Sequence, residues 1–189
     1  MKLGRIFGIE ITVHVTWLFV FALFAWSLSS GFGPFVQLRV SEGARIALAI
    51  FTTLLFFMSV LIHELAHSLL ARSRGIHVRG IMLFIFGGVS QFEEEASSAP
   101  IAAWVSAIGP LTSLALAAVF YGLMRVFGVT PLGVAFAYLS FANLLLAIFN
   151  LIPAYPLDGG RVLQALVWRA TGDQYRATRS AVIVGRVFA

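Results

Sequence analysis

The stretch that decides the fold is LFFMSVLIHELAHSLLA, residues Leu55–Ala71, in which an apolar run carries His63, Glu64 and His67. On a helix, positions i and i+4 lie on the same face, so the two imidazoles can converge on one metal ion. Glu64 follows the first ligand and lies within reach of a water on such an ion, where a carboxylate acts as a general base. The spacing therefore predicts a metal site on a helix.

The residues that lead into this motif are apolar enough to lie in a membrane. From Ala44 to Leu61 the only polar or charged residues are Arg45, Thr52, Thr53 and Ser59. Of all 189 residues, 60% are hydrophobic and 11% are charged, and the mean hydropathy is +0.95. A soluble domain has roughly 25% charged residues. The composition therefore excludes a soluble globule and predicts an integral membrane protein.

The pattern predicts an all-α polytopic bundle of about four to six transmembrane helices, with a small β segment at the membrane surface, forming one domain over residues 1–189. Core spans are expected over residues 13–29, 44–71, 101–126 and 131–152, and further apolar segments over 162–168 and 181–189. The β segment is expected at residues 76–92, where β-branched and aromatic residues surround Gly87 and Gly88. Alternating isoleucines favour a short strand within the first twelve residues.

The basic residues indicate the orientation of the chain rather than a nucleic-acid partner. The net charge is +5, but Lys and Arg form no dense stripe and are not interleaved with aromatic residues. With the N-terminus in the cytoplasm, four spans leave Arg39, Arg45 and Arg125 on the far side. Nine basic residues then lie on the cytoplasmic side: Lys2, Arg5, Arg72, Arg74, Arg79, Arg161, Arg169, Arg176 and Arg179. Such a bias is typical of cytoplasmic loops.

This orientation brings a third ligand to the two histidines. The second and fourth spans both run inward, so His63 and His67 near the end of one lie at the depth of Asp158, which follows the other. The chain has no cysteine, so an oxygen ligand is the one that completes the set and leaves a fourth position open for water. Three polar residues that bond only one another are the alternative, and the cost of burying ionisable groups argues against it.

Two further features are expected to be structural. His14, at the start of the first span, and His77, in the β segment, are expected to be interfacial or surface residues rather than ligands. Gly109 and Pro110 are expected to kink the third span and let a neighbour approach closely.

Several motifs together resemble one known family. NLIPAYPLDGGR, Asn150–Arg161, carries the aspartate in an N-x-x-P-x-x-P-L-D-G-G segment, FGGVSQF, Phe86–Phe92, is a glycine-containing β segment, and AIGPLTS, Ala107–Ser113, contains a Gly-Pro pair. With HELAH, they resemble the site-2 protease family of intramembrane zinc metalloproteases. The match is to the prokaryotic six-span branch without a PDZ insertion, whose members are often followed by CBS domains. The resemblance covers nearly the whole chain.

The resemblance implies one Zn²⁺ per chain, held by His63, His67 and Asp158, with Glu64 activating the water. It also implies that Asn150 lies beside the site, where its amide contacts the substrate backbone or stabilises the developing oxyanion. The substrates would be single-span, membrane-anchored regulatory proteins, cut within or next to their transmembrane segments in regulated intramembrane proteolysis. The protein would lie in the inner membrane of a prokaryotic cell with its active site near the cytoplasmic face.

A substrate helix must unwind before it is cut, because its carbonyls are tied up in hydrogen bonds. A strand edge in residues 81–92 offers main-chain pairing to the extended segment. Gly87 and Gly88 are expected to let the substrate backbone approach closely there.

Two other functions fit part of the pattern. A membrane metal-binding or transport protein would use the histidines but gives no role to Glu64 or to the β segment. A cleavage-dead homologue that binds other membrane proteins is disfavoured by the intact Glu64. The expected partners are transmembrane protein substrates and the lipid bilayer, without nucleic acid, and a homo-oligomer is left open. Metal-dependent cleavage of a reconstituted substrate separates the three functions.

Overall fold

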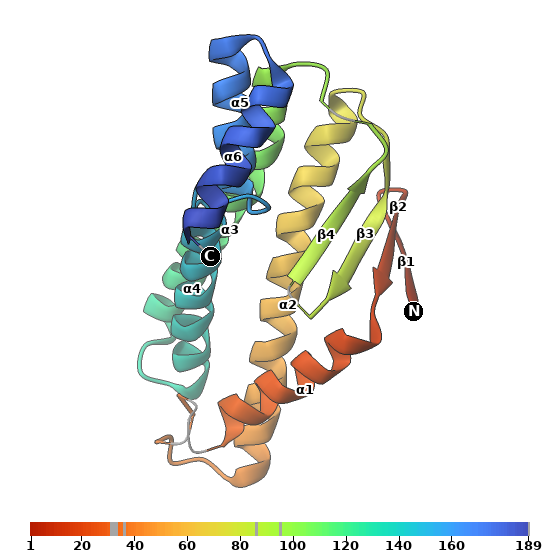
Figure 1. Cartoon of the computed structure of the whole chain (residues 1–189). Coiled ribbons are helices and arrows are strands. Elements are labelled where there is room, and N and C mark those ends of the chain that lie inside the picture. The colour runs from red at the N-terminus through yellow and green to blue at the C-terminus, as the bar shows by residue number, and fades with distance from the viewer. Residues whose placement is uncertain (31–33, 36, 86, 95, 189) are drawn as a thin grey trace.

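The computed structural model of the chain describes residues 1–30, 34–35, 37–85, 87–94 and 96–188. Within these residues the elements follow the order β1 (Lys2–Ile6), β2 (Ile9–Val13), α1 (Val15–Ser29), α2 (Glu42–Ser73), β3 (Val78–Phe84), β4 (Gly87–Phe92), α3 (Ala99–Phe127), α4 (Pro131–Asn150), α5 (Asp158–Thr171) and α6 (Gln174–Phe188). The sheet lies against one side of α2, and the helices from α3 onward lie on the other (Figure 1). The expected helical bundle with a small β segment is thus confirmed.

Three helices are long and apolar enough to cross a membrane. They are α2, α3 and α4, with 32, 29 and 20 residues. The first expected span, 13–29, forms only the 15 residues of α1, about 22 Å of helix, which is short of a hydrocarbon core of roughly 30 Å. The helix starts late because Val13 belongs to β2, where it pairs with Leu83 of β3. His14 then caps α1 by accepting a hydrogen bond from the Thr16 amide.

The four strands form one mixed sheet in the order β1-β2-β3-β4. β1 and β2 make an antiparallel hairpin, β2 and β3 run parallel, and β3 and β4 are antiparallel. The short strand expected near the N-terminus is therefore a hairpin, and the segment expected at 76–92 is the β3–β4 pair; residue 86 lies outside the described residues. In the described part of the chain, β4 has a strand on one side only, so its other edge is free for main-chain pairing.

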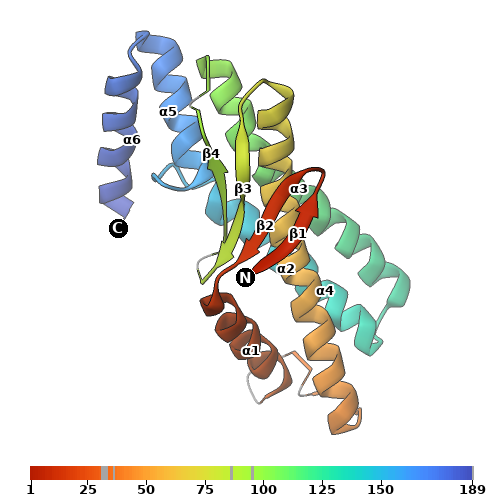
Figure 2. The ribbon, with the colours of Figure 1, turned by 90° about the vertical axis from the view of Figure 1, so that its right-hand side faces the viewer.

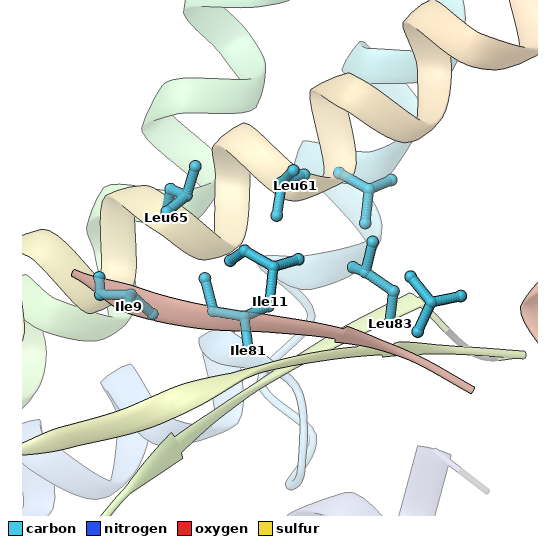
Figure 3. Packing of buried hydrophobic residues seen from close by; sticks show 8 residues of the cluster. Ile9, Ile11, Leu61, Leu65, Ile81 and Leu83 are labelled. Atoms are coloured by element: carbon cyan, nitrogen blue, oxygen red, sulfur yellow. The ribbon is translucent and has the colours of Figure 1, made fainter. Parts of the chain in front are cut away.

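An apolar core attaches this sheet to α2 at the level of the metal motif. Ile9 and Ile11 of β2, with Ile81 of β3, pack against Leu61 and Leu65, the residues that flank His63 and Glu64 on α2 (Figure 3). Each of these five side chains is buried, and burying one such side chain is worth about 1.5–3 kcal/mol. The packing therefore holds the sheet, and β4 with it, in register with the motif.

The remaining helices bring the second metal motif to the first. Ser140 of α4 donates to the carbonyl of Ala117 on α3 at 2.8 Å, and the Asn143 amide donates to Ser59 of α2 at 3.3 Å. After α4 the backbone is irregular until Asp158 begins α5. α5 and α6 fold back on each other beside α3 (Figure 1). They contain the segments expected at 162–168 and 181–189, of which residue 189 lies outside the described residues.

Candidate metal centre

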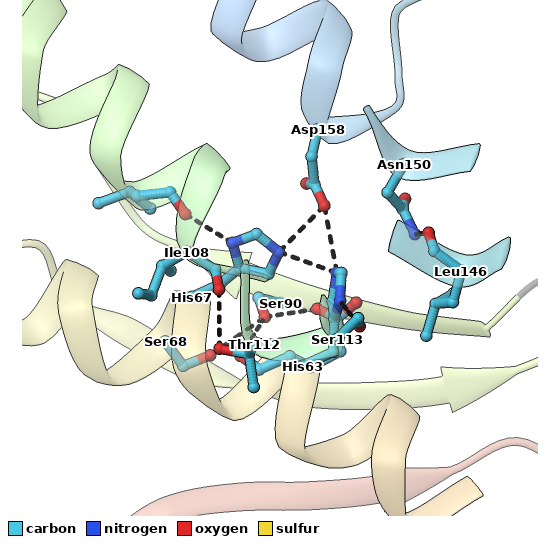
Figure 4. Close-up of polar contacts among 12 residues, drawn as sticks. His63, His67, Ser68, Ser90, Ile108, Thr112, Ser113, Leu146, Asn150 and Asp158 are labelled. Carbon is cyan, nitrogen blue, oxygen red and sulfur yellow. Dashed lines mark hydrogen bonds and ion pairs between the residues drawn. The ribbon is translucent and has the colours of Figure 1, made fainter. Parts of the chain in front are cut away.

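The two histidines of the motif point their Nε2 atoms toward each other on one face of α2. These atoms are 3.2 Å apart, because residues four apart lie on the same face of a helix. Both side chains are buried, with His63 3% and His67 5% exposed. The predicted convergence of the imidazoles is therefore present in the folded chain (Figure 4).

Asp158, the first residue of α5, completes the cluster. Its Oδ2 atom lies 3.1 Å from His63 Nε2 and 3.2 Å from His67 Nε2. The two following glycines allow this position, because a Cβ on Gly159 would lie 2.2 Å from the Leu151 carbonyl oxygen and one on Gly160 would lie 2.4 Å from the backbone nitrogen of Tyr155. The start of α5 therefore packs directly on the turn that follows α4.

The outer nitrogens of both imidazoles are held by α3. His67 Nδ1 lies 2.6 Å from the Val105 carbonyl oxygen, and since a carbonyl only accepts, this nitrogen carries a proton. In the neutral imidazole the Nε2 lone pair is then free for a metal. His63 Nδ1 bonds the Ser113 hydroxyl at 2.9 Å. The third helix thereby sets the orientation of both rings.

The donor set fits zinc. Two imidazole nitrogens and one carboxylate oxygen are ligands that zinc binds in proteins. Four ligands at about 2.05 Å from a tetrahedral zinc are separated by about 3.3 Å. The three atoms here lie 3.1–3.2 Å from one another, so little movement is needed. They form a group that can hold an ion and leave a fourth position open.

Gly109 of α3 covers one side of this cluster. A Cβ at this position would lie 2.1 Å from His67 Nε2 and 2.6 Å from His63 Nε2. Any side chain would therefore occupy space that belongs to the ligands. The close approach expected at Gly109 is confirmed, and α3 continues as a helix through Pro110.

Glu64 is held from the side of the sheet. The Ser90 hydroxyl of β4 donates to its Oε2 atom at 2.8 Å, and Ser68, one turn along α2, donates to the Ser90 oxygen at 3.1 Å. A Cβ on Gly88 would lie 2.3 Å from the Glu64 Cγ atom, so β4 lies directly on this side chain. The strand thus fixes the carboxylate beside the cluster.

The other predicted residues lie as follows. Asn150 ends α4 next to the start of α5 (Figure 4), but its amide donates to Leu146 of its own helix at 3.0 Å; within the described chain it has no hydrogen bond to the cluster. Gly87 has a φ of +120°, which favours glycine where β3 turns into β4. His77 is exposed and lies 3.4 Å from Glu94, away from the metal cluster.

The comparisons with known proteins identify the family. A family model described as peptidase family M50 matches residues 51–189, which include all three candidate ligands. The chain belongs to peptidase family M50. This is the site-2 protease family, so the family resemblance of the sequence is confirmed. Membership and the apolar helices together make the chain an integral membrane protein.

M50 relatives match this chain from end to end. Protein sll0528 of Synechocystis sp. is 41% identical and Rip3 of Mycobacterium tuberculosis 40% identical, each over 100% of this chain and 49% of its own length. Zinc metalloprotease MJ0392 of Methanocaldococcus jannaschii is 31% identical over 100% of this chain and 51% of its own length. All three are named as zinc metalloproteases, the first two as putative ones. The chain spans about half the length of these relatives.

A solved M50 structure has the same fold. The site-2 protease from Methanocaldococcus jannaschii matches with a TM-score of 0.67 and 27% sequence identity, over 100% of this chain and 80% of that one. The likeness extends over the sheet and the helices described above, because it covers the whole chain.

Four residues around the M50 site were not anticipated from sequence as contacts. The Ser113 hydroxyl bonds His63, and the Val105 carbonyl bonds His67. Ser90 bonds Glu64, and Ser68 bonds Ser90. For Ser68 a signal existed, because it is four residues after Glu64 and shares its helix face. The others depend on which turn of α3 and which side of β4 meets α2.

Proposed function

We propose that this chain is an intramembrane zinc metalloprotease that hydrolyses peptide bonds within or next to the transmembrane segments of single-span, membrane-anchored regulatory proteins. The observation that carries the proposal is the convergence of His63, His67 and Asp158, from helices 91 and 95 residues apart in sequence, within 3.2 Å. Glu64 lies next to the first ligand in a fixed orientation. Residues 1–189 act as one intramembrane protease domain in this proposal.

The side chains divide the chemistry among themselves. His63, His67 and Asp158 would hold a zinc ion, which would supply a Lewis acid for the scissile carbonyl and the attacking water. Glu64 takes the proton of the attacking water and later gives it to the leaving amine. The Ser90 hydroxyl donates to Oε2 of Glu64 and so holds the carboxylate in place for this proton transfer. Asn150, at the end of α4, contacts the substrate backbone or the developing oxyanion.

The free edge of β4 holds the substrate in an extended form. An added strand supplies main-chain hydrogen bonds that replace those lost when the substrate helix unwinds. Gly87 and Gly88 begin this strand without side chains, and Gly88 lies against Glu64. A backbone paired there passes close to the general base.

The orientation follows from the charges. The N-terminal strand β2 pairs with β3, which follows α2, so the N-terminus and the end of α2 lie on the same side. With the N-terminus in the cytoplasm of a prokaryotic cell, Arg72 and Arg74 at the end of α2 and Arg161 in α5 lie on the cytoplasmic side. The ends of α2 and α4 that carry His67 and lead to Asp158 then lie near the cytoplasmic face of the inner membrane. Water reaches the site from that side.

The test uses the purified protein, loaded with zinc and reconstituted with a single-span reporter protein. Glu64→Gln is expected to keep one zinc per chain and to lose cleavage. Glu42→Gln is the matched control, because Glu42 lies exposed in the first turn of the same helix; it is expected to cleave normally. Cleavage that persists in Glu64→Gln, or in wild-type protein treated with a chelator, refutes the proposal. The site is then assigned to metal binding or transport.

A further inference from the structure

A cleft of about 320 Å³ adjoins the metal centre. We call it the Arg161 cleft. It lies between the end of β4, the start of α3 and α5; its lining includes Phe92, Val105, Ser106, Arg161, Gln164 and Trp168. Figure 2 shows β4 facing α5 along this side of the sheet. No step of the proposed catalysis uses this cleft.

The cleft continues the path of a substrate paired with β4. Ser90, which bonds Glu64, precedes Phe92 by two residues on the same strand. Val105, whose carbonyl holds His67, lines the same cleft. Arg161 follows Asp158 by one turn of α5. An extended segment whose reacting bond lies at Glu64 therefore enters this cleft within about two to four residues.

Among the described residues that line the cleft, Arg161 is a charged residue without an ionic partner. Its side chain is partly buried and makes no ion pair or hydrogen bond to any residue that the structure describes. The acidic residues at the mouth differ, because Glu93 pairs with Arg79 at 3.1 Å and Glu94 with His77 at 3.4 Å. Their side chains are 46% and 61% exposed, so water screens them further. In the part of the lining that the structure describes, the inner wall thus presents the Arg161 guanidinium without a paired carboxylate.

We propose, building on the proteolysis proposed above, that the Arg161 cleft is a substrate subsite that takes an acidic side chain about two to four residues from the scissile bond. A guanidinium binds a carboxylate through two parallel hydrogen bonds. Phe92 and Trp168 line the same cleft and provide apolar surface for the stem of that side chain. The substrate class is therefore a membrane-anchored protein with Asp or Glu at this distance from the cut.

The test measures binding without cleavage. Glu64→Gln protein in detergent is titrated with fluorescent, capped, extended peptides that differ only in one central residue, Asp, Asn or Lys. The Asp peptide is expected to bind about tenfold more tightly than the Asn peptide, as a charge-assisted pair exceeds a neutral one. Moving the Asp by one residue turns it to the other face of the strand and is expected to remove the gain.

Variants at Arg161 test whether this residue causes the tighter binding of the Asp peptide. Arg161→Gln is expected to abolish the difference between the Asp and Asn peptides, and Arg161→Glu to reverse the preference in favour of Lys. Arg169→Gln is the matched control, since Arg169 is exposed on the same helix and is outside the cleft lining; the tenfold ratio is expected to persist there. Zinc content is measured for each variant.

Two results overturn the subsite. One is equal or absent binding of the Asp and Asn peptides, and the other is an Asp preference that survives in Arg161→Gln. Cleavage of the same peptides by the wild-type protein, with and without chelator, tests proteolysis separately. Chelator-sensitive cleavage without an Asp preference refutes the subsite alone, whereas an Asp preference in binding without any cleavage refutes proteolysis alone.

Discussion

Replacing Gly109 by alanine is expected to remove the metal while leaving the helix intact. The added Cβ would lie 2.1 Å from His67 Nε2 and 2.6 Å from His63 Nε2, whereas unbonded heavy atoms approach to about 3.5 Å. Relief requires α3 or the His67 imidazole to move by about 1.4 Å, which is more than half of a zinc–nitrogen bond of about 2.0–2.1 Å. We expect zinc affinity to fall by more than about 100-fold, beyond the 10–100-fold typical of lost outer contacts. Overpacking costs about 1–3 kcal/mol of stability.

The assay is zinc content after equilibration with buffered zinc, together with thermal unfolding with and without the ion. Gly122→Ala is the matched control on the same helix, because its Cβ would have no atom within 4 Å. We expect the control to keep one zinc per chain and the stabilisation that the ion provides, and Gly109→Ala to lose both. A Gly109→Ala protein that binds zinc within about twofold of the wild type would show that the steric reasoning is wrong, because a lost outer contact alone costs about tenfold.

Three more substitutions test the surroundings of the ion. Asp158→Asn is expected to lower zinc content as well as activity, since it removes the anionic ligand; an unchanged zinc stoichiometry would exclude Asp158 from the ligand set. Ser113→Ala, which frees His63 Nδ1, is expected to weaken zinc binding by about 10–100-fold, with Thr112→Ala as a neutral control, because the Thr112 hydroxyl bonds only its own helix; equal affinities in both variants would contradict this. Ser90→Ala is expected to lower kcat about tenfold with KM and zinc content unchanged, and Ser90→Thr to restore it; a change confined to KM would place Ser90 in substrate binding instead.

Much of the fold is predictable because the bilayer demands long apolar helices. The expected spans at 44–71, 101–126 and 131–152 correspond to α2, α3 and α4 within two residues at each end. The span expected at 13–29 is the exception, because pairing of Val13 with β3 takes the first residues of that run into the sheet. Hydropathy reports only that a run is apolar, and it does not report that a neighbouring strand competes for its first residues.

The glycines also show which features the sequence predicts and which depend on tertiary packing. The sequence marked Gly87, Gly88 and Gly109 as places of close approach, but not what would approach them. In the fold, Gly109 lies over the imidazoles and Gly88 over Glu64, while Gly87 provides a left-handed turn. Which neighbouring group occupies the space left by the absent glycine side chain depends on how α3 and β4 rotate as they pack on α2.

The amino-acid sequence alone determined the three candidate metal ligands, since a spacing of four residues places His63 and His67 on one helix face, and the predicted topology brings Asp158 to their depth. Only the tertiary structure decided what surrounds them: Ser113 behind one imidazole, Ser90 behind Glu64, and Arg161 in a cleft beyond. The spacing of residues on one helix face can be read directly from the sequence. Contacts between elements 22 to 95 residues apart depend on helix rotation and strand register, which are set when side chains from several elements pack together.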